Sequence, residues 1–502
     1  MFSVAMRWSD RLVGLVSTLV LARVLLPSDF GLVAMASIAV GLIDTFLDLG
    51  VAQSLIQNQD ASKDDFDTAW TLRFIQSALA AIIVVIAAPL ATSYYKDPRV
   101  TDIMRFMALS VVIGGTENIG IVNFQRNLEF GQEFRFFFLK RICGFVTTIA
   151  AVLTLRTYWA LVIGTLGARV FGVAASFILH PHRPSFTLKS IRKIWSFSQW
   201  VLVRNIGFYL DTRLDKFLVG GREVAAVMGA YTLADEISAL PSTEILAPMN
   251  RVLFPVFSRL QKNLKALTDT YLLAMGVQAL VGIPAAVGIA LVAPEAVMVT
   301  LGQKWMAAVP FVQIIAFVNV VESINTSGGY LSLSLGYVRT LSLFTWTQLL
   351  VFSALTIMIF PQSGALMIAK LRATVVLTNF TATTIFVYTR LPDLRWMSLA
   401  RKIVRPLSGV LAMWLSVRAI ESVVNLPVAE TLILKITSGA LVYGLTVLLL
   451  WQISGKPPGA EQYLLEKVGS LKGSGRLTLE RVRDNSAAKL LNKFLLFIRL
   501  RG

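Results

Sequence analysis

Residues 204–234 read RNIGFYLDTRLDKFLVGGREVAAVMGAYTLA, a stretch that combines the length of a membrane helix with an unusual number of charges. Before the Gly220-Gly221 pair, which is expected to form a turn, it contains five ionisable side chains: Arg204, Asp211, Arg213, Asp215 and Lys216. A charge at bilayer depth costs roughly 2.5–3.5 kcal/mol on insertion scales, so it persists mainly where it faces a helix bundle or a wet cavity. The stretch therefore predicts a membrane helix that lines a functional site.

The composition of the whole chain is that of a polytopic membrane protein. Of its 502 residues, 55% are hydrophobic and only 15% are charged, whereas soluble proteins average about 25% charged residues. The net charge of +18 could indicate nucleic-acid binding, but Lys and Arg stand between long apolar runs instead of forming one basic domain. Membrane topology explains this distribution better, and no nucleic-acid partner is expected.

Apolar runs of about 20 residues, the length that crosses a bilayer, occur fourteen times. We predict an all-α protein whose membrane helices cover residues 8–26, 30–49, 74–94, 102–123, 138–155, 159–179, 197–219, 225–249, 271–293, 307–334, 339–360, 364–388, 404–421 and 431–452. We expect an N-terminal lobe (1–180), a C-terminal lobe (196–389), two additional helices (404–452) and a cytoplasmic tail (453–502).

Charge asymmetry predicts the orientation of these helices. With the N-terminus in the cytoplasm, 31 of the 47 Lys and Arg residues fall in cytoplasmic segments and 5 in external loops. Cytoplasmic loops of membrane proteins carry this excess of positive charge. An odd number of helices would invert half of the pattern, so we predict an even count with both termini in the cytoplasm. The external loops are short and leave no room for an external catalytic domain.

The two halves of the chain share a short repeat. Phe30-Gly31-Leu32-Val33-Ala34-Met35-Ala36 resembles Met228-Gly229-Ala230-Tyr231-Thr232-Leu233-Ala234, at a constant offset of 198 residues. Both copies begin a helix from the same predicted side. Parallel repeats related by an axis along the membrane normal occur in transporters, which bind substrate between the halves.

The end of the chain is basic and amphipathic. In AAKLLNKFLLFIRLRG (487–502), an apolar stripe alternates with four basic residues. Such a helix suits the surface of an anionic inner leaflet, which makes anionic lipids an expected partner. Ordinary cytoplasmic positive charge without a specific ligand is the alternative.

Signatures of catalysis are absent from the sequence. It contains no Gly-rich phosphate loop, and His180-Pro181-His182 lies in a basic loop where no carboxylate or cysteine partner is expected, which argues against a metal site. We therefore predict that the protein is not an enzyme and uses no cofactor apart from coupling to H+ or Na+.

Charged residues inside the predicted helices indicate a cationic cavity. The candidates for substrate binding are Arg23, Arg169, Arg204, Arg213 and Lys216, and the candidates for ion coupling are Glu117, Asp211 and Asp215. Cationic side chains would bind an anion, and two carboxylates one helical turn apart would favour proton uptake. For any single residue, a salt bridge that stabilises helix packing is an equal alternative.

Five motifs, in order along the chain, carry a family resemblance: LARVLLPSDFGLVAMA (21–36), LIDTFLDLGVAQSLIQ (42–57), YLDTRLDKFLVG (209–220), MGAYTLA (228–234) and NRVLFPVFSRLQ (250–261). They look like the lipopolysaccharide and oligosaccharide flippases of the multidrug, oligosaccharidyl-lipid and polysaccharide exporter superfamily. The resemblance covers roughly residues 5 to 450.

The resemblance implies two six-helix lobes around a central cationic cavity, with two further helices, in the bacterial inner membrane. It also implies transfer of an undecaprenyl-pyrophosphate-linked oligosaccharide between leaflets for exopolysaccharide, capsule or O-antigen synthesis, alongside a polymerase and glycosyltransferases. Arg23 and Arg204 match the family positions that contact pyrophosphate. The alternatives are a multidrug-type antiporter, which intramembrane arginines disfavour, and a membrane-embedded polymerase or ligase, which would need a long external loop.

Overall fold

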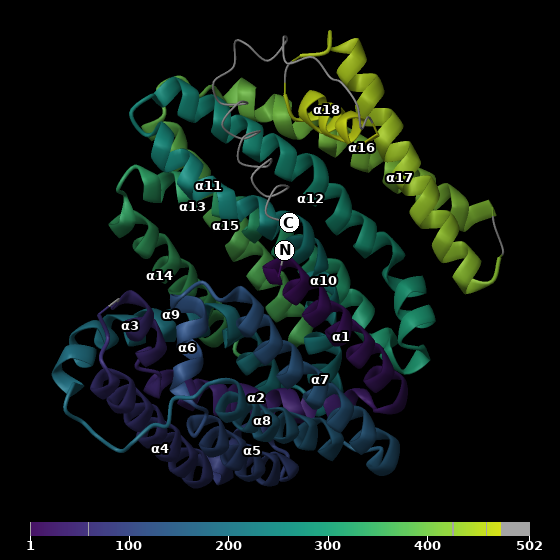
Figure 1. The fold of residues 1–502 in the computed structure, drawn as a ribbon. Helices are drawn as coiled ribbons and strands as arrows, with labels where there is room; N and C mark the ends of the chain where they lie inside the picture. Colours follow the sequence, from purple (N-terminus) through teal and green to yellow (C-terminus); the bar gives the residue numbers. More distant parts are fainter. Residues whose placement is uncertain (1, 59, 424–425, 458, 473–502) are drawn as a thin grey trace. The chain divides into compact units, whose positions relative to one another are not determined.

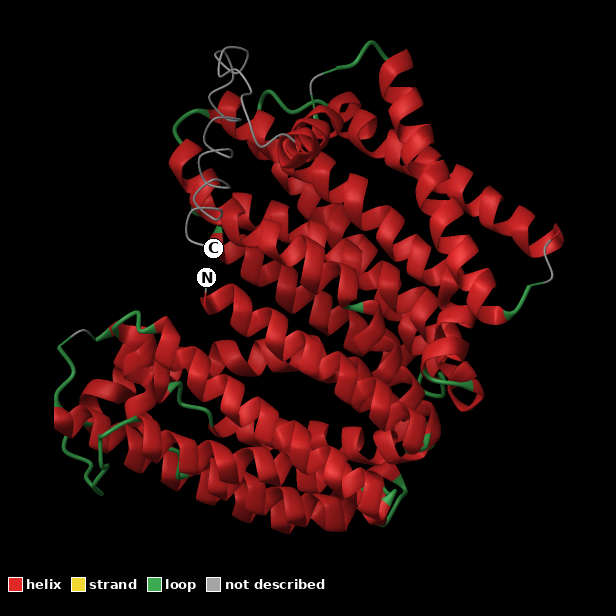
Figure 2. Cartoon of the chain, turned by 45° about the vertical axis from the view of Figure 1, so that its right-hand side comes forward, coloured by secondary structure: helices red, strands yellow, loops and turns green. Residues whose placement is uncertain are grey.

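The computed structural model describes residues 2–58, 60–423, 426–457 and 459–472, and every regular element within these ranges is a helix (Figures 1 and 2). An all-helical fold is expected for apolar segments in lipid, because a helix satisfies its own backbone hydrogen bonds. The chain divides into two units, Met1–Thr232 and Leu233–Arg501. Each unit is described separately below.

The first unit contains α1 (Phe2–Val24), α2 (Pro27–Leu47), α3 (Val51–Gln57), α4 (Lys63–Tyr95), α5 (Arg99–Gly115), η1 (Ile119–Ile121), α6 (Val122–Arg126), α7 (Phe130–Leu155), α8 (Trp159–Leu179), α9 (Ile191–Arg222) and the start of α10 (Ala225–Ser238). Within this unit α4 packs against α5, α7 against α8, and α1 against α7, while α2 packs against α4, α5 and α9. The helix α2 is therefore central to the first unit.

Two local predictions for the first unit are wrong. The third helix begins at Lys63 and not at residue 74, because Ser62 caps it: Ser62 Oγ accepts the Asp65 N–H at 3.3 Å and Asp65 Oδ2 accepts the Ser62 N–H at 2.9 Å. The Gly220-Gly221 pair does not form a turn, since α9 continues to Arg222.

An extended segment, residues 180–190, connects α8 to α9 and lies along the start of α4. The expectation that its histidines lack a carboxylate partner is wrong, because His182 Nε2 lies 3.1 Å from Asp67 Oδ1. Ser185 Oγ donates to the other oxygen of Asp67 at 2.7 Å, and the Ser190 N–H donates to Thr68 Oγ1 at 3.2 Å. Just beyond this segment, in the first turn of α9, Lys193 pairs with Asp65 at 2.6 Å. This segment, 180–190, therefore holds the start of α9 against α4.

The second unit contains the rest of α10, then η2 (Pro241–Leu246), α11 (Ala247–Leu260), α12 (Leu264–Thr300), η3 (Gln303–Ala308), α13 (Val309–Ser334), α14 (Val338–Ala354), η4 (Leu355–Ile359), α15 (Ala365–Arg390), α16 (Trp396–Val423), α17 (Val428–Ile453) and α18 (Ala460–Lys472). The helix α12 packs against α13, α16, α17 and α18.

Inside this unit, Gln278 of α12 donates to Asn250 of α11 and accepts from Ser327 of α13, each at 2.5 Å. These three side chains are buried and bond one another, as polar groups in an apolar interior require.

A buried lysine holds α16 and α17 to α12. Lys435 of α17 is 1% exposed at its side chain, and its Nζ lies 2.5 Å from Glu295 of α12 and 2.6 Å from Glu421 of α16. Near the other end of α16, Arg405 pairs with Glu461 of α18 at 2.5 Å. Figure 1 shows α16, α17 and α18 together beside α12. Ion pairs therefore hold both ends of this helix group.

Ten helices in the described ranges are long and apolar enough to cross a membrane, or eleven if the α5 to α6 pair, bent by 66°, is one span. Helices overlap all fourteen predicted ranges, but α9 carries many charges and the α10 to α11 series is interrupted by a π-helical stretch at Pro241–Leu246. The count of fourteen membrane spans stays a prediction.

The Lys435 cluster generates a stability prediction. Lys435→Met leaves Glu295 and Glu421 facing each other without their cation, and removing one partner of a buried pair costs about 3–5 kcal/mol. We expect the variant to unfold at a clearly lower temperature in detergent. The matched control is Lys370→Met, because Lys370 is exposed on α15. Equal midpoints for the two variants would contradict this account of the cluster.

The His182 contact predicts a pH dependence. Burial lowers the pKa of His182, against the opposing effect of Asp67, so the native state binds a proton less readily than the unfolded state. Stability is therefore fully present above the unfolded pKa of about 6.5 and falls as the pH drops below it. His180 shows the same direction. Thermal midpoints measured from about pH 7 to about pH 5 should fall less steeply in His182→Gln than in the wild type, and parallel curves would refute this.

Candidate functional site

A polar cavity of about 290 Å³ lies inside the first unit. It is lined by charged and amide side chains of several helices, together with small residues: Asp44, Asp48, Val51, Ala52, Gln53, Arg73, Gln76, Ser77, Val111, Gly114 and Arg169. Two carboxylates and two guanidinium groups inside one helical unit are costly unless partners or a ligand compensate them. This cavity is the candidate functional site.

The two arginines come from different helices. Arg169, on α8, is half-buried and approaches α5 at Gly114, where an added Cβ would lie 3.0 Å from Arg169 Nη1. Arg73, on α4, lies 3.9 Å from Glu117. The missing side chain of Gly114 gives the Arg169 guanidinium its place in the cavity wall.

The two carboxylates belong to the end of α2. Asp48, at the C-cap, accepts the Gly50 N–H at 2.9 Å with one oxygen and Asn205 Nδ2 at 3.0 Å with the other. Asp44 is half-buried one turn earlier. Among the described side chains, neither Asp44 nor Arg169 has a hydrogen-bond or ion-pair partner within the 4.0 Å limit for a salt bridge. Within the described residues, the cavity therefore presents a carboxylate and a guanidinium group that make no direct hydrogen bond or ion pair.

Gln76 supports the same conclusion. Its side-chain oxygen is buried and accepts no hydrogen bond from the part of the chain that the structure describes. A buried acceptor without a donor costs about 1–3 kcal/mol, so water or a ligand is expected beside it.

Glu117 lies next to the cavity, where it is an ion-pair partner. Its side chain is 5% exposed, and one oxygen accepts Lys140 Nζ at 2.6 Å, while the other faces Arg73. Glu117 therefore couples Arg73 to α7 through Lys140. Of the predicted site residues, the structure brings Arg169 and Glu117 to this region.

The predicted residues of α9 lie elsewhere in the first unit. Asp215 and Lys216 are buried, and Asp215 accepts the Tyr231 hydroxyl at 2.7 Å. Asp211 is half-buried and Arg213 is exposed. The side chain of Arg204 lies outside the described residues. Arg23 is exposed in the last turn of α1 and is not among the residues that line the cavity.

Sequence reasoning missed Arg73 and passed over Asp44 and Asp48. The predicted third helix begins at residue 74, which leaves Arg73 outside it, whereas the helix in the structure begins eleven residues earlier, at Lys63. The capping signal at Ser62, followed by Asp64 and Asp65, would have placed Arg73 inside the helix. Asp44 and Asp48 are four residues apart on a span end, a spacing that puts both on one face.

Metal chemistry is not indicated by these residues. In the described ranges, no group of three or more His, Cys, Asp and Glu side chains is arranged to bind a metal ion.

A second polar cavity of about 330 Å³, lined mainly by Ser54, Gln57, Asn58, Asp65 and Lys193, lies beside α3 in the same unit.

Comparison with solved structures identifies the fold. The lipid II flippase MurJ, in an inward closed conformation, matches with a TM-score of 0.74, covering 90% of this chain and 98% of that chain at 12% identity. An inward-facing multidrug resistance MATE family transporter matches with a TM-score of 0.56, 80% and 95% coverage and 14% identity. At such low identities these matches show the fold alone. It is the fold that the resemblance of the sequence motifs implies.

Relatives in sequence carry names from surface polysaccharide synthesis. The lipopolysaccharide biosynthesis protein WzxC of Escherichia coli K12 is 24% identical over 326 residues, 63% of this chain and 65% of that protein. The teichuronic acid biosynthesis protein TuaB of Bacillus subtilis 168 is 24% identical over 66% of this chain and 70% of its own length. The succinoglycan biosynthesis transport protein ExoT of Rhizobium meliloti 1021 is 21% identical over 59% and 60%.

A sequence model of one family, described as polysaccharide biosynthesis protein, matches residues 20–310. This match includes all of the cavity residues, α9 and both copies of the repeat. Because it spans more than half of the 502 residues, the chain belongs to the polysaccharide biosynthesis protein family of membrane proteins.

Proposed function

We propose that the protein is a flippase that moves a polyprenyl-pyrophosphate-linked oligosaccharide across the bacterial inner membrane by alternating access, for exopolysaccharide, capsule or O-antigen synthesis. The observation that carries this proposal is the cavity containing Arg73 and Arg169 inside a helical unit of a polysaccharide biosynthesis protein. The name of MurJ, a lipid II flippase of similar fold, agrees with a lipid-linked substrate.

The chemistry of the cavity suits such a headgroup. A guanidinium group binds phosphate oxygens through paired N–H donors, so Arg73 and Arg169 would each contact the pyrophosphate from a different helix. Asp44, Asp48 and Gln76 would accept hydrogen bonds from sugar hydroxyls. We also propose that the headgroup contacts other basic residues at other stages of its translocation: Arg23, Arg204, Arg213 and Lys216. A cavity of this size would hold the pyrophosphate or one sugar, not a whole oligosaccharide.

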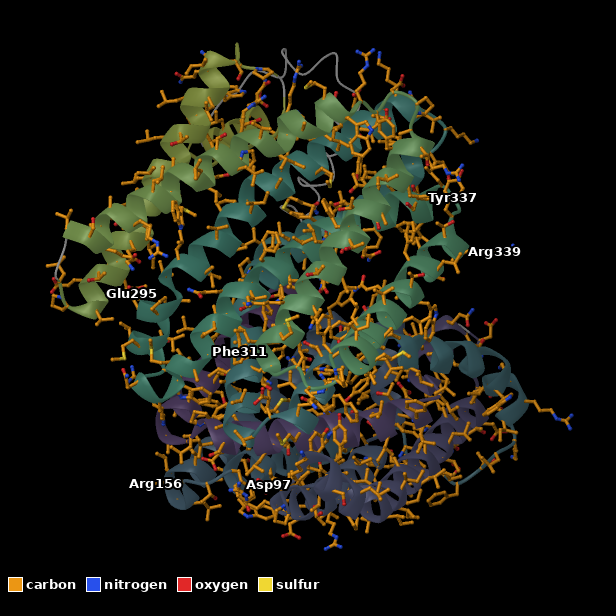
Figure 3. All side chains as sticks on the ribbon, turned by 180° about the vertical axis from the view of Figure 1, so that it is seen from behind. Asp97, Arg156, Glu295, Phe311, Tyr337 and Arg339 are labelled. Atoms are coloured by element: carbon orange, nitrogen blue, oxygen red, sulfur yellow. The ribbon has the colours of Figure 1, made fainter. Side chains whose placement is uncertain are left out.

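The proposed architecture has fourteen spans, with lobes at 1–180 and 196–389, two further helices at 404–452 and both termini in the cytoplasm. Figure 3 supports this topology, since Asp97 and Arg156, both in predicted external loops, lie at one edge of the first unit. In the second unit, Arg339 of a predicted cytoplasmic loop lies opposite Glu295. The tail (453–502) would bind anionic lipids, and its residues 473–502 lie outside the described ranges. A polymerase and glycosyltransferases would act on the same substrate.

Coupling to H+ or Na+ would reset the transporter, and Glu117, Asp211 and Asp215 remain the proposed carriers. Glu117 would have to release Lys140, and Asp215 would have to release the Tyr231 hydroxyl, before binding an ion. These exchanges would couple ion binding to helix movement.

Reconstituted transport tests the proposed function. Proteoliposomes containing the purified protein and lipid-linked repeat unit from the source cells should transfer the lipid between leaflets, measured by its accessibility to an external glycosidase. Empty liposomes are the control. Deleting the gene should also cause the lipid-linked intermediate to accumulate on the cytoplasmic face. Movement of organic cations without movement of the lipid-linked repeat unit would instead identify a multidrug antiporter.

The cavity arginines generate a second prediction. Arg169→Ala and Arg73→Ala should each lower the transfer rate by about tenfold or more, because a charge-assisted contact to phosphate contributes about 1.5–3 kcal/mol. The matched control is Arg105→Ala, since the Arg105 side chain is 54% exposed on α5. Protein amount and thermal midpoint are measured in parallel. Full transfer by both cavity variants would rule out this cavity as the headgroup site.

A further inference from the structure

The two copies of the sequence repeat touch each other through their glycines. A Cβ added to Gly31 of α2 would overlap the carbonyl oxygen of Ala225 and lie 2.9 Å from the Gly229 nitrogen. A Cβ added to Gly229 of α10 would overlap the carbonyl oxygen of Pro27 and lie 2.9 Å from the Gly31 nitrogen. The first turns of α2 and α10 therefore cross backbone to backbone, and we call this contact the glycine crossing.

The crossing is reciprocal. Gly31 and Gly229 are 198 residues apart, and so are Pro27 and Ala225, which is the offset of the repeat. When each member of a contact maps onto the other by the repeat, the contact lies on the axis that relates the two copies. The glycine crossing is therefore a junction between the repeats, placed where a movement of one repeat against the other would open or close it.

A second seam lies beside the crossing in the same unit. An added Cβ on Gly220 of α9 would lie 2.8 Å from the ring of Tyr95, and one on Gly221 would overlap the ring of Tyr94. Tyr94 stacks on Phe217 with ring centroids 4.6 Å apart and donates its hydroxyl to the Phe217 carbonyl at 3.2 Å. The Gly220-Gly221 pair thus lets the end of α4 seat directly on α9.

The physics of these contacts suits a seal that re-forms repeatedly. Glycines let helix backbones approach closely, and such contacts are stabilised by many weak van der Waals interactions instead of by interlocking side chains. Close contact of this kind also excludes water from between the two helices. Any side chain at Gly31 or Gly229 would hold the helices apart.

We propose that the glycine crossing is the closed external gate of the transporter and that the repeats separate here when the headgroup is released. This inference rests on the proposed alternating-access function and on the predicted external position of the loops that precede α2 and α10. The seam of Tyr94, Tyr95 and Phe217 would open together with it.

Distance measurements test the gate directly. In a Cys143→Ser background, spin labels are attached at Asp102→Cys and Val224→Cys, both exposed positions next to the starts of α5 and α10. Gly31→Val and Gly229→Val should each shift the distance distribution toward longer values, by similar amounts because the crossing is reciprocal. Gly31→Ala, which adds a smaller side chain, should shift the distance distribution by a smaller amount. Gly131→Val is the matched control, because no atom lies within 4 Å of a Cβ added there.

An unchanged distance distribution in Gly31→Ala and both valine variants, or an equal shift in the Gly131 control, would overturn the proposal.

A cross-link that holds the contact closed provides the second test. Tyr94→Cys and Phe217→Cys, joined by a short reducible bis-thiosulfonate reagent, should stop transfer, and reduction should restore it. Undiminished transfer by the cross-linked protein would also overturn the gate. If the protein transfers no lipid-linked oligosaccharide at all, the proposed function fails, while the distance measurements still decide whether the crossing opens.

Discussion

The cost of taking a charge out of water is the constraint on which this structure depends. A chain with long apolar helices cannot leave ionised side chains in hydrocarbon, so each must find a partner, a cavity or the rim of the membrane. Lys435 lies between Glu295 and Glu421, and Glu117 receives Lys140. These pairs join separate segments, and Lys435 and Glu295 are 140 residues apart in sequence. These ion pairs hold the apolar helices in a defined arrangement.

The same constraint distinguishes the cavity from these ion pairs. Asp44 and Arg169 line one space without a direct protein partner in the described ranges, and Gln76 adds a buried acceptor. A polar space of this kind is stable only when it is hydrated or occupied by a ligand. Asp44, Arg169 and Gln76 therefore differ from the structural pairs, because their polar side-chain groups have no direct partner among the described residues. Residue type alone does not reveal this difference.

Close approach of helices is the second physical theme. Gly114 makes room for Arg169, Gly220 and Gly221 admit the tyrosines of α4, and Gly31 meets Gly229. In an apolar medium, helices gain little from burying apolar surface against one another, so close backbone contact becomes an important source of packing energy. The glycines of this chain thus mark helix contacts, and Gly220-Gly221 is such a contact inside α9 and not a turn.

Much of the fold was predictable from the sequence alone. Apolar runs of span length and the low charged fraction indicated an all-helical membrane protein, and the motifs from 21 to 261 indicated its family. These properties depend on local composition and order along the chain, because lipid imposes one backbone solution on every apolar segment. The repeat at an offset of 198 was also visible, since it is a property of the order of residues.

Only the tertiary structure decided which charges share a space. Arg169 lies with Asp44 and Arg73, Glu117 is held by Lys140, and Asp215 is turned toward Tyr231. No periodicity along one helix determines these pairings, because each joins side chains from different helices through packing. The sequence by itself determined the membrane class and the family. The packing of helices determined the cavity and the reciprocal contact of Gly31 with Gly229, since both depend on distances of a few ångströms between separate segments.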